Sequence, residues 1–180
     1  MSKMNEGFHQ RIISMMLSGE IKDREGLQRA KVKLCRSYGL VAVPANSEIL
    51  AHVREEDRAS VLPLLIRKPM RTMSGVAVVA VMTSPHPCPH GKCSFCPGGT
   101  ELGSPQSYTG KEPAARRAMR NDYDPRLQVQ DRIAQLEAIG HRTDKIDLIV
   151  MGGTFTCRDQ AYQEWFVKGC FDAMNGRDAE

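Results

Sequence analysis

Two runs of β-branched and other apolar residues most constrain how this 180-residue chain folds. VAVVAVM covers residues 76–82 and KIDLIVM covers 145–151. Apolar runs of this length are typical of strands that are buried on both faces of a parallel sheet. Helical sequence lies between them, at about 113–122 and 125–139, and follows the second at about 159–174. This βαβα order predicts an α/β fold with parallel strands and right-handed crossovers.

The first 75 residues have a different pattern, which predicts a basic helical module. Helical periodicity covers about 4–18 and 23–38, and shorter helical stretches follow up to about residue 66. Residues 1–75 carry 13 Lys and Arg against 8 Asp and Glu, whereas residues 76–180 carry 12 against 13. We therefore expect two domains, 1–75 and 76–180, and a polyanionic partner for the first.

Four basic residues of this module fall on one side of the second predicted helix. Lys22, Arg29, Lys33 and Arg36 lie within about 60° of one another on a helical wheel, apart from the apolar arc. We call these four residues the basic stripe. Such a stripe is either a solvated helix face or a contact with nucleic acid.

The sequence shows neither a membrane span nor a secretory signal. No apolar run approaches the roughly 20 residues that cross a bilayer, and no long apolar stretch precedes a small-residue cleavage site near the N-terminus. We expect a cytoplasmic protein with no membrane partner. In a reducing compartment, clustered cysteines serve more often as metal ligands or catalytic thiols than in disulfides.

Three of the six cysteines lie in PCPHGKCSFCPGG, residues 87–99, shortly after the first predicted strand. Their spacing is Cys88-x4-Cys93-x2-Cys96, and the other three cysteines are isolated. A glycine-containing loop, GGT, follows the second strand. Because chemistry in such folds lies at the carboxyl ends of parallel strands, we expect the two loops to be neighbours in space.

The cysteine loop fits either zinc or an iron–sulfur cluster. A structural zinc site needs four ligands, and only His86 or His90 of the same loop is available as the fourth, because the chain has no second C-x2-C. Iron–sulfur clusters also bind thiolates, and three close cysteines leave one iron open to a substrate. The spacing therefore favours a catalytic 4Fe–4S cluster, with zinc as the alternative.

The cysteine loop and its surroundings resemble a known family. A strand followed by three cysteines, with an aromatic residue before the last (CSFC), is similar to the radical S-adenosylmethionine (SAM) superfamily, most of whose members have three residues between the first two cysteines. The segments CPHGKCSFCPGG, QSYTGKEPAARRAMRNDYDP, AIGHRTDKIDLIVMGGTF and YGL…PANSEIL resemble the catalytic subunit of Elongator and its archaeal and bacterial homologues, the tRNA uridine carboxymethyl synthases. This resemblance covers essentially the whole chain. It implies that the α/β part contains the first βα units of a partial radical-SAM barrel.

The resemblance also implies roles for single residues near the two strands. Cys88, Cys93 and Cys96 would ligate the 4Fe–4S cluster, whose open iron binds SAM, and reduction would cleave SAM to a 5′-deoxyadenosyl radical. Phe95 matches the aromatic residue beside the SAM adenine, with ordinary loop packing as the alternative. Gly152, Gly153 and Thr154 match a segment that receives the SAM amino group. Lys145 matches a lysine that contacts acetyl-CoA.

The family's reaction transfers a two-carbon unit from acetyl-CoA to the wobble uridine of tRNA. The adenosyl radical takes hydrogen from the acetyl methyl group, and the carbon radical adds to uracil C5, which leads to a 5-carboxymethyl group. Basic side chains would then bind tRNA phosphates, which give affinity but little sequence choice. The candidates are the basic stripe, Lys22, Arg29, Lys33 and Arg36, and the group Arg116, Arg117 and Arg120, for which a solvated helix face is the alternative.

The family also contains the rest of the barrel, further cysteines and a C-terminal acetyltransferase-like domain, none of which these 180 residues include. We therefore expect the N-terminal portion of a larger enzyme, which does not turn over alone and whose partner is the remainder as a separate chain or a second copy. Two alternatives stay open. One is a non-catalytic tRNA-binding module with a zinc-stabilised cysteine loop, and the other is a different radical-SAM enzyme.

Overall fold

The computed structural model describes residues 3–176, which fall into two compact units. Unit 1 extends to Ser74 and also includes Leu136–Arg142, whereas unit 2 contains Gly75–Gln135 and continues from Thr143. No helix in the described part of the chain is both long and apolar enough to cross a membrane. The boundary near residue 75 lies where the sequence changes character, but residues 136–142 join the first unit instead of the second.

Unit 1 is a small bundle of helices around one core. Its elements are α1 (Lys3–Leu17), α2 (Arg24–Ser37), α3 (Asn46–Ala51), α4 (Glu55–Leu65) and the 3-10 helix η1 (Pro69–Thr72). The Asp23 carboxylate accepts from the Gly26 backbone N–H at 2.6 Å and so caps α2, as the sequence predicts. Phe8, Ile12, Ile49 and Val61 come from three different helices and are fully buried in the shared core. Apolar burial therefore holds these short helices together.

The buried polar side chains of unit 1 include the ring of His9. The His9 ring is 2 % exposed and stacks on the His52 ring, with centroids 4.1 Å apart. Neither ring nitrogen of His9 has a hydrogen-bond partner among the described residues. Burial, together with the nearby His52, lowers the pKa of His9, so its ring is neutral at pH 7.

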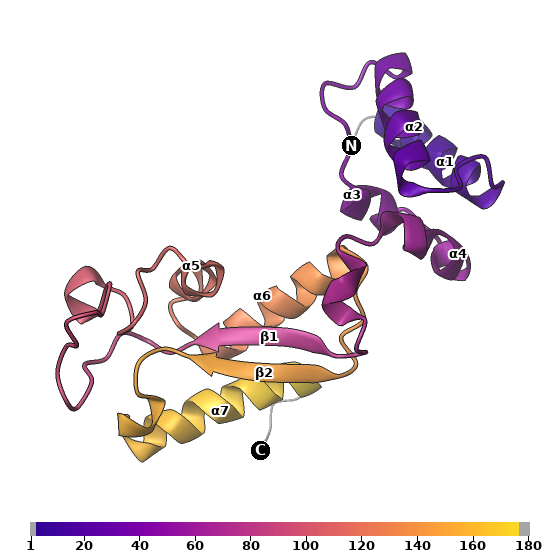
Figure 1. Cartoon of the computed structure of the whole chain (residues 1–180). Coiled ribbons are helices and arrows are strands. Elements are labelled where there is room, and N and C mark those ends of the chain that lie inside the picture. Colours follow the sequence, from indigo (N-terminus) through magenta and orange to yellow (C-terminus); the bar gives the residue numbers. More distant parts are fainter. Residues whose placement is uncertain (1–2, 177–180) are drawn as a thin grey trace. The chain divides into compact units, whose positions relative to one another are not determined.

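Unit 2 is built on two parallel strands, β1 (Ala77–Met82) and β2 (Ile146–Met151), which pair in register from Ala77↔Ile146 to Met82↔Met151. Figure 1 shows the two strands side by side and pointing the same way. The helices of this unit are α5 (Pro113–Arg120), α6 (Pro125–Ala138) and α7 (Gln160–Asn175), with the 3-10 helices η2 (Thr100–Leu102) and η3 (Phe155–Cys157). The predicted mixed α/β order of helices, parallel strands and further helices is confirmed.

The two faces of this sheet are covered to different extents. On one face, Val79 and Val81 pack in a core with Val129 of α6 and with Phe166 and Cys170 of α7. On the other, Met82 packs with alanines of α5, but Val78 and Ile149 remain 43 % and 42 % exposed. The prediction that both strands are buried on both faces is therefore wrong for this second face, because α5 covers only the part near the carboxyl end of the strands.

The outer edge of β1 is occupied by side chains instead of another strand. The Arg117 guanidinium of α5 donates to the Ala80 carbonyl at 2.9 Å. The buried Gln128 amide of α6 makes two bonds to Met82: its Oε1 accepts from the backbone N–H at 2.8 Å, and its Nε2 donates to the carbonyl at 3.0 Å. These bonds satisfy backbone groups that an edge strand would otherwise leave unpaired.

We expect Gln128→Ala to lower the free energy of unfolding of unit 2 by about 2–4 kcal/mol, because it leaves the buried N–H and C=O of Met82 without partners. The measurement is urea denaturation followed by circular dichroism. Gln130→Ala is the matched control, since Gln130 is an exposed glutamine on the same helix and its loss should change stability by less than about 0.5 kcal/mol. Equal effects of the two substitutions would contradict this role of Gln128.

Candidate functional site

The loops that follow β1 and β2 meet at the carboxyl end of the sheet. The Thr83 N–H donates to the Met151 carbonyl at 2.9 Å, which extends the strand pairing by one residue. Beyond it, the Thr154 hydroxyl lies 3.7 Å from the Cys88 sulfur, and the Cys157 sulfur lies 3.9 Å from the Pro87 carbonyl. The expectation that the cysteine loop and the glycine-containing loop are neighbours is confirmed.

Two glycines make this close approach sterically feasible. Gly152 has a φ of +116°, and a Cβ at this position would collide with the Thr83 hydroxyl. A Cβ on Gly153 would lie 3.4 Å from the Cys88 sulfur and 3.2 Å from the Gln106 Cβ. A larger residue at 152 would therefore be strained in its backbone and blocked by Thr83. The loop after β2 can thus bring its backbone directly against the cysteine loop.

Arg158 and Tyr162 fix the start of the cysteine loop. The Arg158 guanidinium donates to the Ser84 carbonyl at 3.0 Å and to the Ser84 hydroxyl at 3.1 Å, and it lies over the Tyr162 ring at 3.5 Å. The Tyr162 hydroxyl in turn accepts from the Ser84 N–H at 3.1 Å. These contacts tie the residues after β1 to the first turn of α7, and the sequence reading did not identify them.

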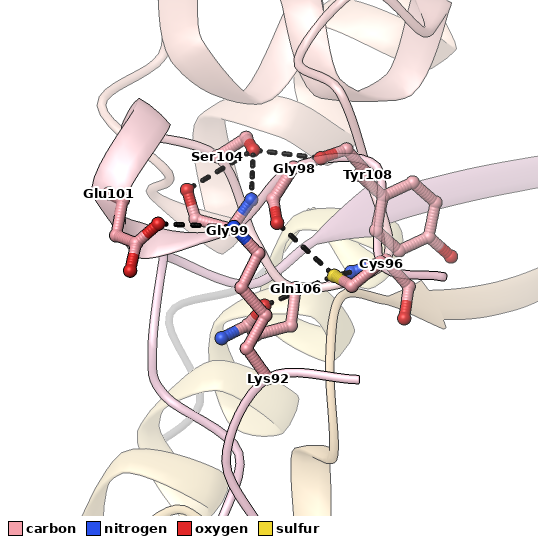
Figure 2. A network of polar contacts seen from close by, with 9 residues as sticks. Lys92, Cys96, Gly98, Gly99, Glu101, Ser104, Gln106 and Tyr108 are labelled. Carbon is pink, nitrogen blue, oxygen red and sulfur yellow. Dashed lines mark hydrogen bonds and ion pairs between the residues drawn. The ribbon is translucent and has the colours of Figure 1, made fainter. Parts of the chain in front are cut away.

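A strap of chain, residues 97–108, folds back against Cys96, and Figure 2 shows its polar contacts with the Cys96 sulfur. The Ser107 N–H donates to the Cys96 sulfur at 3.1 Å, and the Gln106 Oε1 and the Gly98 carbonyl each lie 3.2 Å from that sulfur. The fully buried Ser104 hydroxyl holds the strap together. It accepts from the Gly99 N–H at 3.0 Å and donates to the Tyr108 carbonyl at 2.8 Å.

The outer side of the strap carries an ion pair, also drawn in Figure 2. Lys92, which precedes the second cysteine of the loop, lies 3.0 Å from the Glu101 carboxylate. The side chains are 43 % and 75 % exposed, so this pair adds little stability. The buried contacts of Ser104 and Gln106 therefore determine the shape of the strap. Neither residue is among those singled out from the sequence.

Cys93, the second thiol of the loop, has a different neighbour. The Cys93 sulfur lies 3.3 Å from the His90 Nε2. Cys88, Cys93 and Cys96 are all free and partly exposed. In the described part of the chain, no three or more His, Cys, Asp or Glu side chains converge into a metal site. The three thiols are nevertheless of the chemical type that binds thiophilic metal groups. They lie unpaired in one loop, and the Cys96 sulfur already accepts a backbone N–H.

Phe95 and Lys145 occupy very different positions relative to these thiols. Phe95 is 84 % exposed, so ordinary packing inside the loop does not explain it. Lys145 directly precedes β2, at the end of the sheet opposite the two loops, and its carbonyl accepts from the Ala77 N–H at 2.8 Å. A six-residue strand spans about 20 Å, so the structure does not bring Lys145 together with the cysteine loop.

Most of the basic stripe lies on one exposed face of α2. Arg29, Lys33 and Arg36 border a surface hollow along the helix, together with Gln28, Val32 and Ser37. Arg29 also forms an exposed ion pair with Glu25 at 2.6 Å. Lys22 differs from the prediction, because α2 begins only at Arg24, behind its cap at Asp23. Lys22 therefore lies outside the helix, and a helical wheel does not describe its direction. Its side chain is exposed.

In the second basic group, on α5, two side chains are exposed and one is buried. Arg116 and Arg120 are exposed on α5, and Arg120 lies 3.5 Å from Asp131. Arg117 is only 7 % exposed and is bonded to the edge of β1. Burial lowers the pKa of Arg117. We therefore leave Arg117 out of any nucleic-acid surface, since its guanidinium is committed to the Ala80 carbonyl.

We expect Ser104→Ala to loosen the strap over Cys96, because it removes the hydroxyl that joins Gly99 to Tyr108. Losing these buried bonds should cost about 1–3 kcal/mol of local stability. The measurement is hydrogen exchange of peptides that cover residues 97–108, which should speed up clearly in the variant. Ser107→Ala removes an exposed hydroxyl from the same strap and is the control. Unchanged exchange in Ser104→Ala would show that this hydroxyl does not organise the strap.

Comparisons with known proteins identify relatives of this chain. A family profile described as the ELP3 N-terminal domain matches residues 7–73. The tRNA uridine(34) acetyltransferase of Methanocaldococcus jannaschii is 52% identical over 176 residues, which cover 94% of this chain and 32% of that protein. Elongator complex protein 3 of Drosophila melanogaster is 42% identical over 176 residues, which cover 93% of this chain and 32% of that protein.

The human Elongator complex protein 3 is 46% identical over 158 residues, which cover 83% of this chain and 29% of that protein. The solved structure of the archaeal Elp3 of Methanocaldococcus infernus with an N-terminal deletion is 42% identical, with a TM-score of 0.40 over 59% of this chain and 17% of that chain. The chain thus spans about a third of the length of these curated relatives. It is a homologue of Elongator complex protein 3 and the tRNA uridine(34) acetyltransferases, and it corresponds to their N-terminal portion.

Proposed function

We propose that this chain is the N-terminal portion of a radical-SAM enzyme that forms a 5-carboxymethyl group on the wobble uridine of tRNA from SAM and acetyl-CoA. The observation that carries the proposal is the meeting of Cys88 with Gly153 and Thr154 at the carboxyl end of two parallel strands. The homology to proteins named tRNA uridine(34) acetyltransferase also supports the proposal. In this proposal, unit 2 contains the first βα units of the partial radical-SAM barrel, and unit 1 is the basic helical module that binds tRNA.

Cys88, Cys93 and Cys96 would hold a 4Fe–4S cluster in this proposal. Such a cluster supplies the electron that cleaves SAM. The chain's own contribution is to present the three free thiols on one loop. The Ser107 N–H bond to Cys96 supports this role, because N–H bonds to cluster sulfurs tune the reduction potential.

The SAM amino group would lie along Gly152, Gly153 and Thr154, and Phe95 would cover the adenine. The backbone of this loop is accessible because neither glycine carries a Cβ, and the exposed Phe95 ring is available to a ligand. The acetyl-CoA contact at Lys145 rests on the resemblance alone. The tRNA backbone would contact the stripe on α2, with Arg116 and Arg120 of α5 as further contacts.

Zinc is the second candidate for the cysteine loop. The 3.3 Å approach of Cys93 to His90 supplies a Cys–His pair of the kind that zinc uses. With zinc, the chain would be a tRNA-binding module whose loop is stabilised by the metal, and it would not bind SAM. A third candidate is a different radical-SAM reaction. Identifying the modified nucleoside would distinguish it from the formation of a 5-carboxymethyl group.

We expect anaerobic reconstitution with iron and sulfide to yield a brown protein with about four irons per chain. Cys93→Ala should lose this cluster, whereas Cys35→Ala should keep it, since Cys35 lies in the core of unit 1. Iron, zinc and labile sulfide are measured together. A Cys93→Ala chain that retains its full cluster would contradict the ligand assignment. One equivalent of zinc without sulfide would favour the second candidate.

We expect the triple substitution Lys22→Glu, Arg29→Glu and Lys33→Glu to weaken tRNA binding and to reduce its salt dependence. Each phosphate contact contributes a slope of about 0.7–0.9 in a plot of log K against log salt concentration, so the slope should fall by about two to three. Filter binding or fluorescence anisotropy measures this slope.

The charge-matched control reverses three basic residues outside the stripe, Arg11→Glu, Arg58→Glu and Lys111→Glu. Both triple variants change the net charge equally, so a general electrostatic effect would weaken both alike. A stripe variant with the affinity and slope of the control would reduce the α2 surface to a solvated helix face.

A further inference from the structure

A fourth thiol lies beside the cysteine loop, and the proposed function gives it no role. Cys157 is at the end of η3, in the loop that follows β2. Its sulfur lies 2.8 Å from the Thr154 carbonyl and 3.9 Å from the carbonyl of Pro87, the residue just before Cys88. Cys157 is free and partly exposed, as Cys88 is.

Cys88 is the thiol of the cysteine loop that contacts the same backbone segment as this fourth thiol. The Thr154 hydroxyl lies 3.7 Å from the Cys88 sulfur, and a Cβ on Gly153 would lie 3.4 Å from it. The sulfurs of Cys88 and Cys157 therefore border the same short piece of backbone, Gly153–Thr154. The other two thiols have different surroundings, since Cys93 lies against His90 and Cys96 lies under the strap.

We propose that Cys88 and Cys157 form a disulfide when the cluster-free chain meets a peroxide. One thiol attacks the O–O bond of hydrogen peroxide, becomes a sulfenic acid and releases the first water. The second thiol then attacks the sulfur of that sulfenic acid, forms the S–S bond and releases the second water. In total, two thiols lose two hydrogens and two electrons, and one hydrogen peroxide is reduced to two waters.

This disulfide would control the loading of the cysteine loop, a consequence that rests on the proposed function. A sulfur in a disulfide is not a thiolate ligand, so the bond removes Cys88 from the three-thiol set. Reduction by an external dithiol restores the set. Oxidation would thus store the empty loop in a form that is protected from irreversible oxidation of Cys88.

The two remaining cysteines do not compete for this bond. Cys35 is 6 % exposed in the core of unit 1, and Cys170 is fully buried in the core of unit 2. Burial raises the pKa of Cys170 to about 12, so its thiolate is scarce at neutral pH. Peroxide should therefore act first on the thiols of the two loops.

Trypsin separates the relevant cysteines, which makes the bond directly measurable. Cleavage after Lys and Arg places Cys88 alone in peptide 72–92 and Cys157 alone in peptide 146–158, whereas Cys93 and Cys96 share peptide 93–111. The apo chain is treated with hydrogen peroxide, alkylated, digested and analysed by mass spectrometry. We expect a linked species of peptides 72–92 and 146–158 that disappears after treatment with dithiothreitol.

Two variants test the partner. Cys157→Ser preserves a donor to the Thr154 carbonyl but should give no linked species, whereas Thr156→Ser in the same loop should link as the wild type does. Linkage of peptide 72–92 to 93–111 in place of 146–158, or oxidation of Cys88 to a sulfinic acid while Cys157 stays free, would overturn the proposal.

Iron uptake separates this proposal from the proposed function. We expect the oxidised chain to lose iron uptake under anaerobic reconstitution and to regain it after reduction. A reduced chain that takes up no iron would contradict the cluster, while the peptide link would still stand. A chain that loads iron when reduced but never forms the link would retain the proposed function and overturn the disulfide.

Discussion

The parallel pairing of β1 with β2 is the constraint on which the rest of unit 2 depends. The register from Ala77↔Ile146 to Met82↔Met151 makes both strands end at the same level. The loops that leave them must therefore start side by side, and one more hydrogen bond, from Thr83 to Met151, holds them there. The contact between Cys88 and Thr154 follows from this pairing, although 65 residues separate them in the sequence.

The α-helices and both strands were predictable because each has a local signal. Asp23 caps α2 and Gly39 follows its end with a φ of 63°, and both residue types mark helix ends in a sequence. The apolar runs predicted both strands. The exposure of Val78 and Ile149 was not predictable, because it depends on how much of one sheet face α5 covers, which is a tertiary property.

The candidate site was predictable only in part, for the same reason. The spacing of its cysteines identifies the loop, and the βα order predicts its neighbour. Ser104 and Gln106 were missed because their bonds to Gly99 and Cys96 lie within an irregular strap that has no periodic pattern. The prediction for Arg117 did not anticipate its burial, because the sequence shows its charge but not the carbonyl of Ala80 that its guanidinium reaches.

The same bonds of α5 and α6 also decide in which direction this sheet can grow. The Ala80 carbonyl is occupied by Arg117, and both backbone groups of Met82 are occupied by Gln128. A strand that approached this edge of β1 would have to displace buried side chains and leave a guanidinium and an amide without partners, which is costly. Side chains that bond to the backbone of an edge strand therefore block the addition of a further strand there. Any further strand of this sheet has to pair with β2, whose far edge carries no strand in the described part of the chain. Growth in that direction leaves the cysteine loop at one border of the sheet, beside the part of the β1 edge that Arg117 and Gln128 occupy.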